Sequence, residues 1–505
     1  MSKYKKLAFT ILVTGDAFAI NYLINFFLTP YVTENIGTDA YGFVTLARSF
    51  ASYAMIITIA LNSYAARFIT VEYHRNNIYV ANIYYNSVFF ADLLLGSLIF
   101  VASILFSLKI EFFLDIDARL VDDVRVLFVL VFLNLWINTS GTALQVAAYI
   151  KNKLDVIGIA RSASYIAEAL LLIGCYTFFP AKVFFVGIGM IVATMTITCS
   201  NFYVAKKYTP ELNIDKSLFS PKAVKKLVVY GVWNSLNSLG NTLNNGLDLI
   251  VANVMLSAMA MGQISIVKTV FAIFSGVYQL IAQPFQPIFL KDYAAGNKHE
   301  LMKNLKLSMK ISGLISNLIF AGFFALGLDY FRLWIPSQDS NLMYQLTLLA
   351  TVTCILEGPI YPLYYIYTLT EKNKIPCLIT IAGGILNVIG MYSLIKYTSV
   401  GVYSIQITTA VIMLFISGVT NPLYMAHCFG EKLFVFYPII GRNVLSCGVM
   451  MVIMKIISST MKTTTWISLI IVALVCVLIG SLIHVLIVFS IEEKAKFLKI
   501  FQHKN

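Results

Sequence analysis

Two basic residues lie inside long hydrophobic segments, at corresponding positions of a weak internal repeat. Arg48 follows Tyr41-Gly-Phe-Val-Thr-Leu-Ala, and Lys268 follows Met261-Gly-Gln-Ile-Ser-Ile-Val, 220 residues further along the chain. An unpaired charge in hydrocarbon costs about 3 kcal/mol or more, so such residues normally face a partner or a wet cavity. Two matched cations therefore predict a basic internal chamber, which suits an anionic cargo.

Further charged residues fall within the hydrophobic segments. Arg161 and Lys310 join Arg48 and Lys268 as candidate substrate-binding cations. The acids with the same kind of placement are candidates for binding a coupling proton or sodium ion, or for tuning the bases: Asp16, Asp92, Glu168, Asp248 and Glu357. For each of these residues a structural ion pair is the alternative interpretation. Glu168 in particular could pair with a base on another helix.

Amide side chains make a second polar pattern. Asn21 and Asn25 lie four residues apart in the first hydrophobic segment. Asn234, Asn237, Asn241 and Asn245 follow one another at spacings of three and four, which places them on one face of a helix. One interpretation is hydrogen bonding between helices, at about 0.6 kcal/mol per bond in a membrane. The length of the stripe favours the other, a cavity wall that binds sugar hydroxyls or water.

The composition defines the elements that must position these residues. Of the 505 residues 59% are hydrophobic and 12% are charged, which is typical of a polytopic membrane protein and predicts an all-α fold. Segments long enough to cross about 30 Å of hydrocarbon as helices recur along the chain. Fourteen are predicted, at 7–29, 42–66, 79–107, 124–149, 156–179, 181–204, 227–256, 260–289, 307–330, 342–369, 376–396, 399–426, 433–456 and 465–490.

The charge distribution predicts the orientation. The net charge of +13 comes from 37 Lys and Arg against 24 Asp and Glu, and most of the basic residues fall in the tails and in alternate connections. This is the positive-inside bias, which predicts cytoplasmic termini and an even number of spans. The excess positive charge therefore indicates contact with anionic membrane lipids, and no motif for nucleic-acid binding accompanies it.

The repeat suggests the domain organisation. A shift of 220 residues also superposes Asn21 on Asn241 and Gly42 on Gly262. Spans 1–6 and 7–12 then form two parallel lobes. The predicted parts are an N-terminal lobe at 1–205, a cytoplasmic linker at 206–226, a C-terminal lobe at 227–430, and two added spans with an interfacial tail at 431–505. Prolines at 284, 287, 359 and 362 predict kinks in two spans of the second lobe.

Motifs for covalent chemistry are sparse. Asp115-Ile116-Asp117 is similar to the metal-binding motif of glycosyltransferases, but no large outer domain accompanies it. The seven cysteines and five histidines show no metal-ligand spacing, and there is no phosphate-binding loop for a nucleotide. The sequence therefore predicts a protein that is not an enzyme and that uses neither a cofactor nor a metal.

The opening helices carry a resemblance to a known family. Asn21-Tyr-Leu-Ile-Asn-Phe-Phe-Leu-Thr-Pro-Tyr31, Ile36-Gly, Tyr41-Gly-Phe and Ala65-Ala-Arg67-Phe resemble the Wzx-type polysaccharide flippases. These exporters belong to the multidrug/oligosaccharidyl-lipid/polysaccharide (MOP) superfamily, together with the MATE exporters and the lipid II flippase. The resemblance implies a V-shaped carrier of two six-helix lobes plus two C-terminal helices, working by alternating access.

The resemblance also implies a substrate. Flippases of this type move undecaprenyl-diphosphate-linked oligosaccharide repeat units of O-antigen or capsule to the outer leaflet, with suspected coupling to an ion gradient, and a polysaccharide polymerase is a possible partner. Arg48 and Lys268 match the cationic cavity of the family by position. The alternatives are a MATE-type drug/cation antiporter, a lipid II-type flippase and, in another class, a membrane glycosyltransferase or polymerase.

Overall fold

The protein is helical throughout the part of the chain that the structure describes. The computed structural model describes residues 3–151, 153–370, 372–461 and 463–494, without the side chains of residues 3–18, 154, 245, 287 and 294. Contacts divide the chain into two compact units, Met1–Ser265 and Ile266–Asn505. The predicted all-α class is confirmed, since these residues form helices and no strand.

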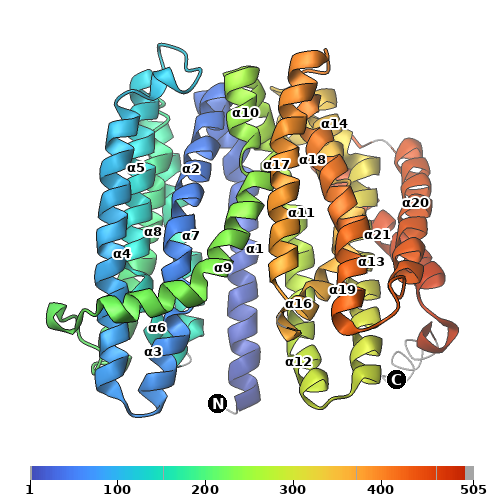
Figure 1. Cartoon of the computed structure of the whole chain (residues 1–505). Helices are drawn as coiled ribbons and strands as arrows, with labels where there is room; N and C mark the ends of the chain where they lie inside the picture. Colours follow the sequence, from blue (N-terminus) through green and yellow to red (C-terminus); the bar gives the residue numbers. More distant parts are fainter. Residues whose placement is uncertain (1–2, 152, 371, 462, 495–505) are drawn as a thin grey trace. The chain divides into compact units, whose positions relative to one another are not determined.

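The first unit contains ten helices and the start of an eleventh (Figure 1). They are α1 (Lys3–Ile36), α2 (Thr38–Asn62), α3 (Ala65–His74), α4 (Ile78–Ser107), α5 (Val121–Ser140), α6 (Thr142–Ile150), α7 (Leu154–Phe178), α8 (Phe185–Tyr208), α9 (Pro221–Asn245), α10 (Asp248–Met255) and α11 (Ala258–Ala282). Short 3₁₀ turns, η1 (Ile110–Phe112) and η2 (Lys216–Leu218), lie in the connections. Within this unit α7 packs against α1 and α8, and α9 packs against α2.

The second unit continues from α11. Its other helices are α12 (Gln286–Ala294), α13 (Lys298–Trp334), α14 (Ser340–Thr351), α15 (Cys354–Ile360), α16 (Tyr365–Leu369), α17 (Lys374–Tyr397), α18 (Tyr403–Phe415), α19 (Asn421–Phe429), α20 (Tyr437–Thr460) and α21 (Trp466–Val488). Central α13 packs against α15, α20 and α21. Short 3₁₀ and π turns interrupt the spans: η3 (Gln283–Phe285), η4 (Tyr361–Tyr364) and η5 (Ile416–Thr420).

Polar residues and prolines set the ends and breaks of these helices. Ser220 caps α9, whose first residue is Pro221, and Thr465 caps α21 through a reciprocal pair with Ser468. The prolines at 284 and 287 coincide with η3 and the start of α12, and those at 359 and 362 with α15 and η4. The predicted interruptions of both spans are therefore confirmed, because proline cannot donate the helical hydrogen bond.

When spans are counted by helix length and apolarity, their number is lower than the predicted fourteen. Every one of the fourteen predicted segments coincides with a helix or a run of helices. By length and apolarity, however, eleven helical stretches of the described residues qualify as spans, or twelve if α5 and α6, bent by 40°, are one span. Neither α9 nor the described part of α1 qualifies. The count of fourteen is therefore not confirmed, and in α9 the five Asn and three Lys explain the low hydropathy.

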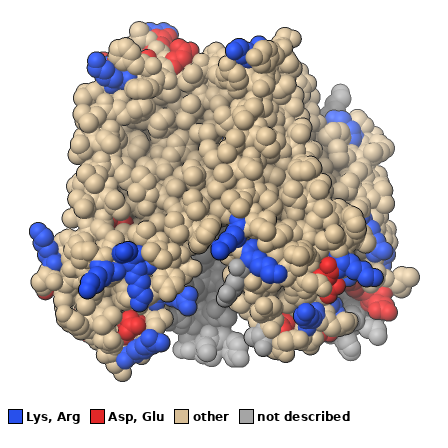
Figure 2. Space-filling model, in the orientation of Figure 1, with Lys and Arg blue, Asp and Glu red and all other residues tan. Residues whose placement is uncertain are grey.

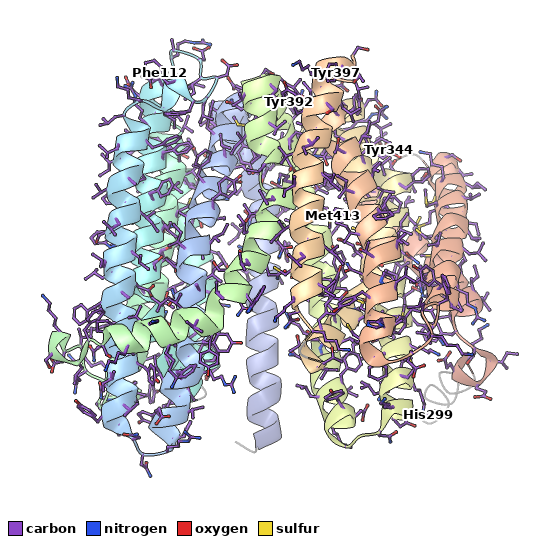
Figure 3. All side chains as sticks on the ribbon, in the orientation of Figure 1. Phe112, His299, Tyr344, Tyr392, Tyr397 and Met413 are labelled. Carbon is purple, nitrogen blue, oxygen red and sulfur yellow. The ribbon has the colours of Figure 1, made fainter. Side chains whose placement is uncertain are left out.

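Charged and aromatic residues gather at the helix ends. Lys and Arg concentrate at the end of the first unit where α9 begins, which agrees with the predicted charge asymmetry (Figure 2). In the second unit, Tyr392 and Tyr397 lie at one end of the helices and His299 at the other (Figure 3). Lys396 donates to the hydroxyl of Tyr392 and lies over both tyrosine rings. Such an aromatic and basic rim is typical of a helix that ends at a membrane interface.

Gly42 and Gly262, which the repeat superposes, touch each other within the first unit. A Cβ atom on Gly42 would lie 2.9 Å from the backbone nitrogen of Gly262, and one on Gly262 would overlap the carbonyl oxygen of Thr38. The absence of side chains therefore lets the starts of α2 and α11 cross at backbone distance. This contact explains why both halves of the repeat need glycine at this position.

The connection between α8 and α9 is fixed along the side of α4. The amide of Asn82 donates to the carbonyl of Glu211 (2.8 Å) and accepts from the N–H of Asn213 (3.0 Å). One turn later, the amide of Asn86 donates to the carbonyl of Asn213 (2.9 Å) and accepts from the N–H of Asp215 (2.8 Å). By its contacts this connection, which is most of the predicted linker 206–226, belongs to the first unit; the predicted lobe boundaries remain a prediction.

Replacing Asn86 is expected to release this connection. Asn86 is fully buried, and Asn86→Ala would leave two backbone groups of the connection without partners, at a cost of about 1–3 kcal/mol. Trypsin should then cleave after exposed Lys216 several-fold faster than in the wild type. Ser97→Ala, on the same helix, is the control because Ser97 donates to the carbonyl of Leu93 within α4 itself. Equal cleavage rates in the two variants would contradict the expectation.

Candidate functional site

A polar cavity opens within the first unit, between α1, α2, α5, α7 and α8. Its volume is about 270 Å³. The residues from α1 and α8 recur at helical spacing, so each of these helices presents one face to the cavity. The lining residues are Asn21, Ile24, Asn25, Leu28, Arg48, Asn134, Ser164, Tyr165, Glu168, Met190, Ala193, Thr194 and Ile197.

Arg48 and Glu168 form an ion pair in this cavity. The guanidinium of Arg48, from α2, lies 3.5 Å from a carboxylate oxygen of Glu168, from α7, and the two side chains are 44% and 16% exposed. This distance is long for a charge-assisted hydrogen bond. Glu168 is the polar side-chain partner of Arg48 among the described residues, and a guanidinium carries five N–H donors. The pair therefore leaves donors of Arg48 available to a ligand in the cavity.

Three amides share the cavity with this pair. Asn21 and Asn25 lie one turn apart on α1, and the amide of Asn25 donates to the carbonyl of Asn21 at 2.8 Å. Asn134, from α5, has a buried amide oxygen without a hydrogen-bond partner in the described part of the chain. A buried acceptor without a donor is costly unless water or a ligand supplies one. The cavity therefore offers hydrogen bonds beside a cation.

The amides of α9 lie on a different surface. Asn234, Asn237 and Asn241 are exposed, and none of them lines the cavity of Arg48. Asn244 is buried and donates to the carbonyl of Gly240 at 2.9 Å, whereas the side chain of Asn245 lies outside the described residues. The opposite side of α9 packs on α2, since Ser235 donates to the carbonyl of Ile56. The predicted polar stripe is thus an exposed face of α9.

The other predicted cations have different surroundings. Arg161 is partly buried on α7 but is absent from the cavity lining, and Lys268 is partly buried on α11. Lys310 is 8% exposed, and its ammonium lies 2.7 Å from the carboxylate of Glu493 and over the ring of Phe489. Because this cation is buried and fully engaged near the C-terminus, its surroundings favour a structural ion pair.

The predicted acids also separate. The side chain of Asp16 lies outside the described residues. Asp248 is buried at the start of α10, with 4% of it exposed. Glu357 accepts a hydrogen bond from the hydroxyl of Tyr278 at 2.9 Å, beside the proline-broken segment of the second unit. Of the five candidate acids, Glu168 is the one that lines the cavity with a cation among the described residues.

The loop with Asp115 and Asp117 is held by internal partners. Arg119 donates to the carboxylate of Asp117 at 2.6 Å, and this hydrogen bond lowers the pKa of Asp117 to about 2. The amide of Asn253 binds both the N–H and the carbonyl of Asp115. Among the described residues no group of three or more His, Cys, Asp or Glu is placed to hold a metal ion. The partners of Asp115 and Asp117 in the structure are therefore neighbouring protein groups, as in an ordinary connection between helices.

Sequence reasoning missed part of the cavity wall. Four polar lining residues were not predicted: Asn134, Ser164, Tyr165 and Thr194. Asn134 had a usable signal, because it is an amide within the apolar run Val-Phe-Leu-Asn-Leu-Trp. The small hydroxyls had none, since serine and threonine are frequent in membrane helices and usually bind their own backbone, as Ser164 does with the carbonyl of Arg161.

The helices that are long and apolar enough to cross a membrane define a multi-pass membrane protein. The chain belongs to the polysaccharide biosynthesis protein family, whose sequence profile matches residues 7–292. This membership confirms the resemblance drawn from the opening helices. A curated relative, the "Uncharacterized membrane protein EpsK" of Bacillus subtilis (strain 168), is 25% identical over 507 residues and is covered, like this chain, over 98% of its length.

Solved structures support the fold. An inward-facing multidrug resistance MATE family transporter of the MOP superfamily superposes with a TM-score of 0.68 at 13% identity, covering 81% of this chain and 94% of that one. The lipid II flippase MurJ, in an inward closed conformation, superposes with a TM-score of 0.65 at 14% identity, covering 94% and 99%. At these identities the likeness concerns the fold alone, and it agrees with the predicted MATE-like architecture.

Proposed function

We propose that this protein is a flippase that moves undecaprenyl-diphosphate-linked oligosaccharide repeat units from the cytoplasmic to the outer leaflet of the bacterial plasma membrane. The observation that carries the proposal is the cavity that a half-exposed guanidinium, Arg48, and three amides line together inside the first unit. The family's association with polysaccharide biosynthesis supports the class of cargo.

The chemistry of the cavity matches the head of such a lipid. A diphosphate presents anionic oxygens that accept charge-assisted hydrogen bonds from a guanidinium, and Arg48 keeps donors free of Glu168 for this purpose. Sugar hydroxyls both donate and accept, so Asn21, Asn25 and Asn134 suit the adjoining glycan. A cationic drug would instead be repelled by Arg48, which disfavours the multidrug alternative.

The remaining predicted residues have parts in the same proposal. Amides exposed on α9 are unfavourable against acyl chains, so Asn234, Asn237 and Asn241 suit a water-filled transport path. Lys268 is proposed as a substrate-binding cation of the second unit. Asp16, Glu168, Asp248 and Glu357 stay candidates for ion coupling.

The proposed cycle makes and breaks no covalent bond, so the protein is not an enzyme in this proposal. Two lobes of six spans alternate access to the two leaflets, both termini are cytoplasmic, and the prenyl tail stays in lipid. The product on the outer leaflet is the substrate of a polysaccharide polymerase, which makes such a polymerase the expected partner.

A flipping assay with a matched pair of arginine variants tests the proposal. Proteoliposomes would carry an undecaprenyl-diphosphate-linked disaccharide with a fluorescent tag, and a membrane-impermeant quencher would report the tag that reaches the outer leaflet. Arg48→Ala removes charge-assisted hydrogen bonds of about 1.5–3 kcal/mol, so flipping should slow by roughly 10- to 100-fold. Arg161→Ala removes a cation that does not line the cavity and should stay near the wild-type rate. Equal rates in both variants would refute the role of the cavity.

A further inference from the structure

A carboxylate lies buried near the middle of α4. Asp92 is 0% exposed and stands fourteen residues after the first residue of α4, Ile78, and fifteen before the last, Ser107. At 1.5 Å per residue, each end of the helix is about 21 Å away. Because α4 is one of the stretches apolar enough to span a membrane, this places the carboxylate close to the bilayer midplane.

The carboxylate has one described partner, and that partner is neutral. The amide of Asn62, the last residue of α2, donates to Oδ1 of Asp92 at 3.0 Å. The second carboxylate oxygen of Asp92 and the amide oxygen of Asn62 are buried and have no hydrogen-bond partner among the described residues. Two acceptors are thus left without donors at one buried position, which native structures rarely tolerate.

The charged residues of the elements packed against α4 are engaged elsewhere or lie at the helix ends. On α5, Asp122, Asp123 and Arg125 occupy the first turn, where Arg125 pairs with Glu111 and Asp122. The basic residues of α9 and η2 lie at the end where α9 begins, and Lys226 donates to the hydroxyl of Tyr84. The charged or titratable residues of α2, α3 and α6 are Asp39, Arg48, Arg67, Glu72, His74 and the tyrosines.

None of these groups interacts with Asp92 in the described structure, where Asn62 is its polar partner. An isolated carboxylate in the membrane interior is expensive as an anion, so the group must be neutralised by a proton or by a bound cation. Hard metal cations bound through oxygen commonly take about six ligands, whereas two oxygens lack partners here. The surroundings therefore favour the proton.

We propose that Asp92 and Asn62 form a proton-binding site, separate from the cavity of Arg48, that gains and loses one proton in each transport cycle. Proton uptake forms one O–H bond on the carboxylate and changes its charge from −1 to 0, and release to water on the other side reverses both. Arg48 is fourteen residues before Asn62 on α2, about 21 Å away. The inference rests on the proposed transport function and assigns its coupling ion.

The position of the site suggests how its charge reaches the transport path. The chain leaves α2 directly after Asn62 and turns at Ser63 and Tyr64 before α3 begins. Gly231 of α9 packs on the carbonyl of Ala60 and lies beside the hydroxyl of Ser63. A charge on Asp92 therefore acts at the end of α2, next to the residues on which α9 packs. The exposed amides lie on this same helix α9.

Infrared difference spectroscopy of the full-length protein in lipid vesicles, with the pH as the only variable, tests the site directly. The wild type should show a carboxylic-acid C=O band that disappears as the pH is raised. Asp92→Asn should lack this band, and Asp122→Asn, which changes a 90% exposed carboxylate in the first turn of α5, should keep it. A band that persists at every pH, or one that Asp92→Asn retains, would overturn the proposal. Saturable binding of radioactive sodium that Asp92→Asn abolishes would overturn the assignment of the ion.

A second variant keeps the test decisive if Asp92→Asn does not fold. Asn62→Ala removes the donor to the carboxyl group and should shift the C=O band toward the frequency of a less hydrogen-bonded carboxylic acid. An unchanged band in Asn62→Ala would overturn the role of Asn62. Size-exclusion chromatography of each variant establishes folding beforehand.

A transport measurement separates this inference from the function on which it rests. An imposed pH gradient should accelerate flipping of the tagged lipid by the wild type several-fold. Asp92→Asn should exchange the tagged lipid without that acceleration, and acceleration equal to the wild type would overturn the coupling role. A wild type that fails to flip the lipid would refute the proposed function, whereas the infrared titration would still decide whether Asp92 binds a proton.

Discussion

Gly231→Val is expected to prevent the first unit from folding. A Cβ atom at residue 231 would overlap the carbonyl oxygen of Ala60 and would lie 2.7 Å from the hydroxyl of Ser63. The first of these atoms belongs to the backbone of α2, which cannot rotate away as a side chain can. The two helices are also joined by hydrogen bonds from Ser235 to the carbonyl of Ile56 and from Tyr53 to that of Gly246. The contact can be relieved only by separating α9 from α2.

The expected cost exceeds the 1–3 kcal/mol of ordinary overpacking, so we expect a loss of at least about 3 kcal/mol. The measurement is the yield of monodisperse protein after extraction in detergent, together with its melting temperature. Gly174→Ala is the control, because a Cβ atom on this glycine of α7 meets nothing within 4 Å. That variant should be as stable as the wild type or up to about 1 kcal/mol more stable. Normal yield and melting temperature for Gly231→Val would show that α9 does not pack as described.

The sequence predicted the fold and four of the eight polar residues that line the candidate site. Fourteen apolar segments were located because hydrocarbon requires long runs of apolar residues, and all of them coincide with helices. Arg48, Glu168, Asn21 and Asn25 were identified because polar groups stand out against such runs, and they meet in one cavity. Glu168 had been expected to pair with a base on another helix, and Arg48 is that base.

The partners of the buried polar residues depend on which helix faces contact one another. The hydropathy of the sequence carries no information about these contacts. Lys310 had the same sequence signal as Arg48, yet it binds Glu493, which lies beyond the last span. Asn62 gave no signal, because its importance comes from the end of α2 meeting the middle of α4. The number of spans illustrates the same limit: α9 and α10 cover the predicted segment 227–256, but the amides and lysines of α9 lower its hydropathy below that of a typical span.

The pair of Arg48 and Glu168 offers a test that separates a structural ion pair from a substrate site. Arg48→Glu should place two carboxylates close together in the cavity, where like charges repel. We expect this variant to melt at a lower temperature and to flip the tagged lipid at least roughly 100-fold more slowly than the wild type. The slower rate combines the loss of hydrogen bonds to the diphosphate, each about 1.5–3 kcal/mol, with the repulsion of the anion.

Exchanging both residues, as Arg48→Glu with Glu168→Arg, restores an ion pair between α2 and α7. The melting temperature should therefore recover. Flipping should recover only in part, because the guanidinium would then project from α7, and a 1 Å displacement of a charged contact already weakens binding. Recovery of both properties to wild-type values would show that the pair only holds the helices together. Recovery of stability without full flipping would show that the position of the cation in the cavity determines the flipping rate. Binding of a diphosphate beside the amides of α1 and α5 requires this dependence.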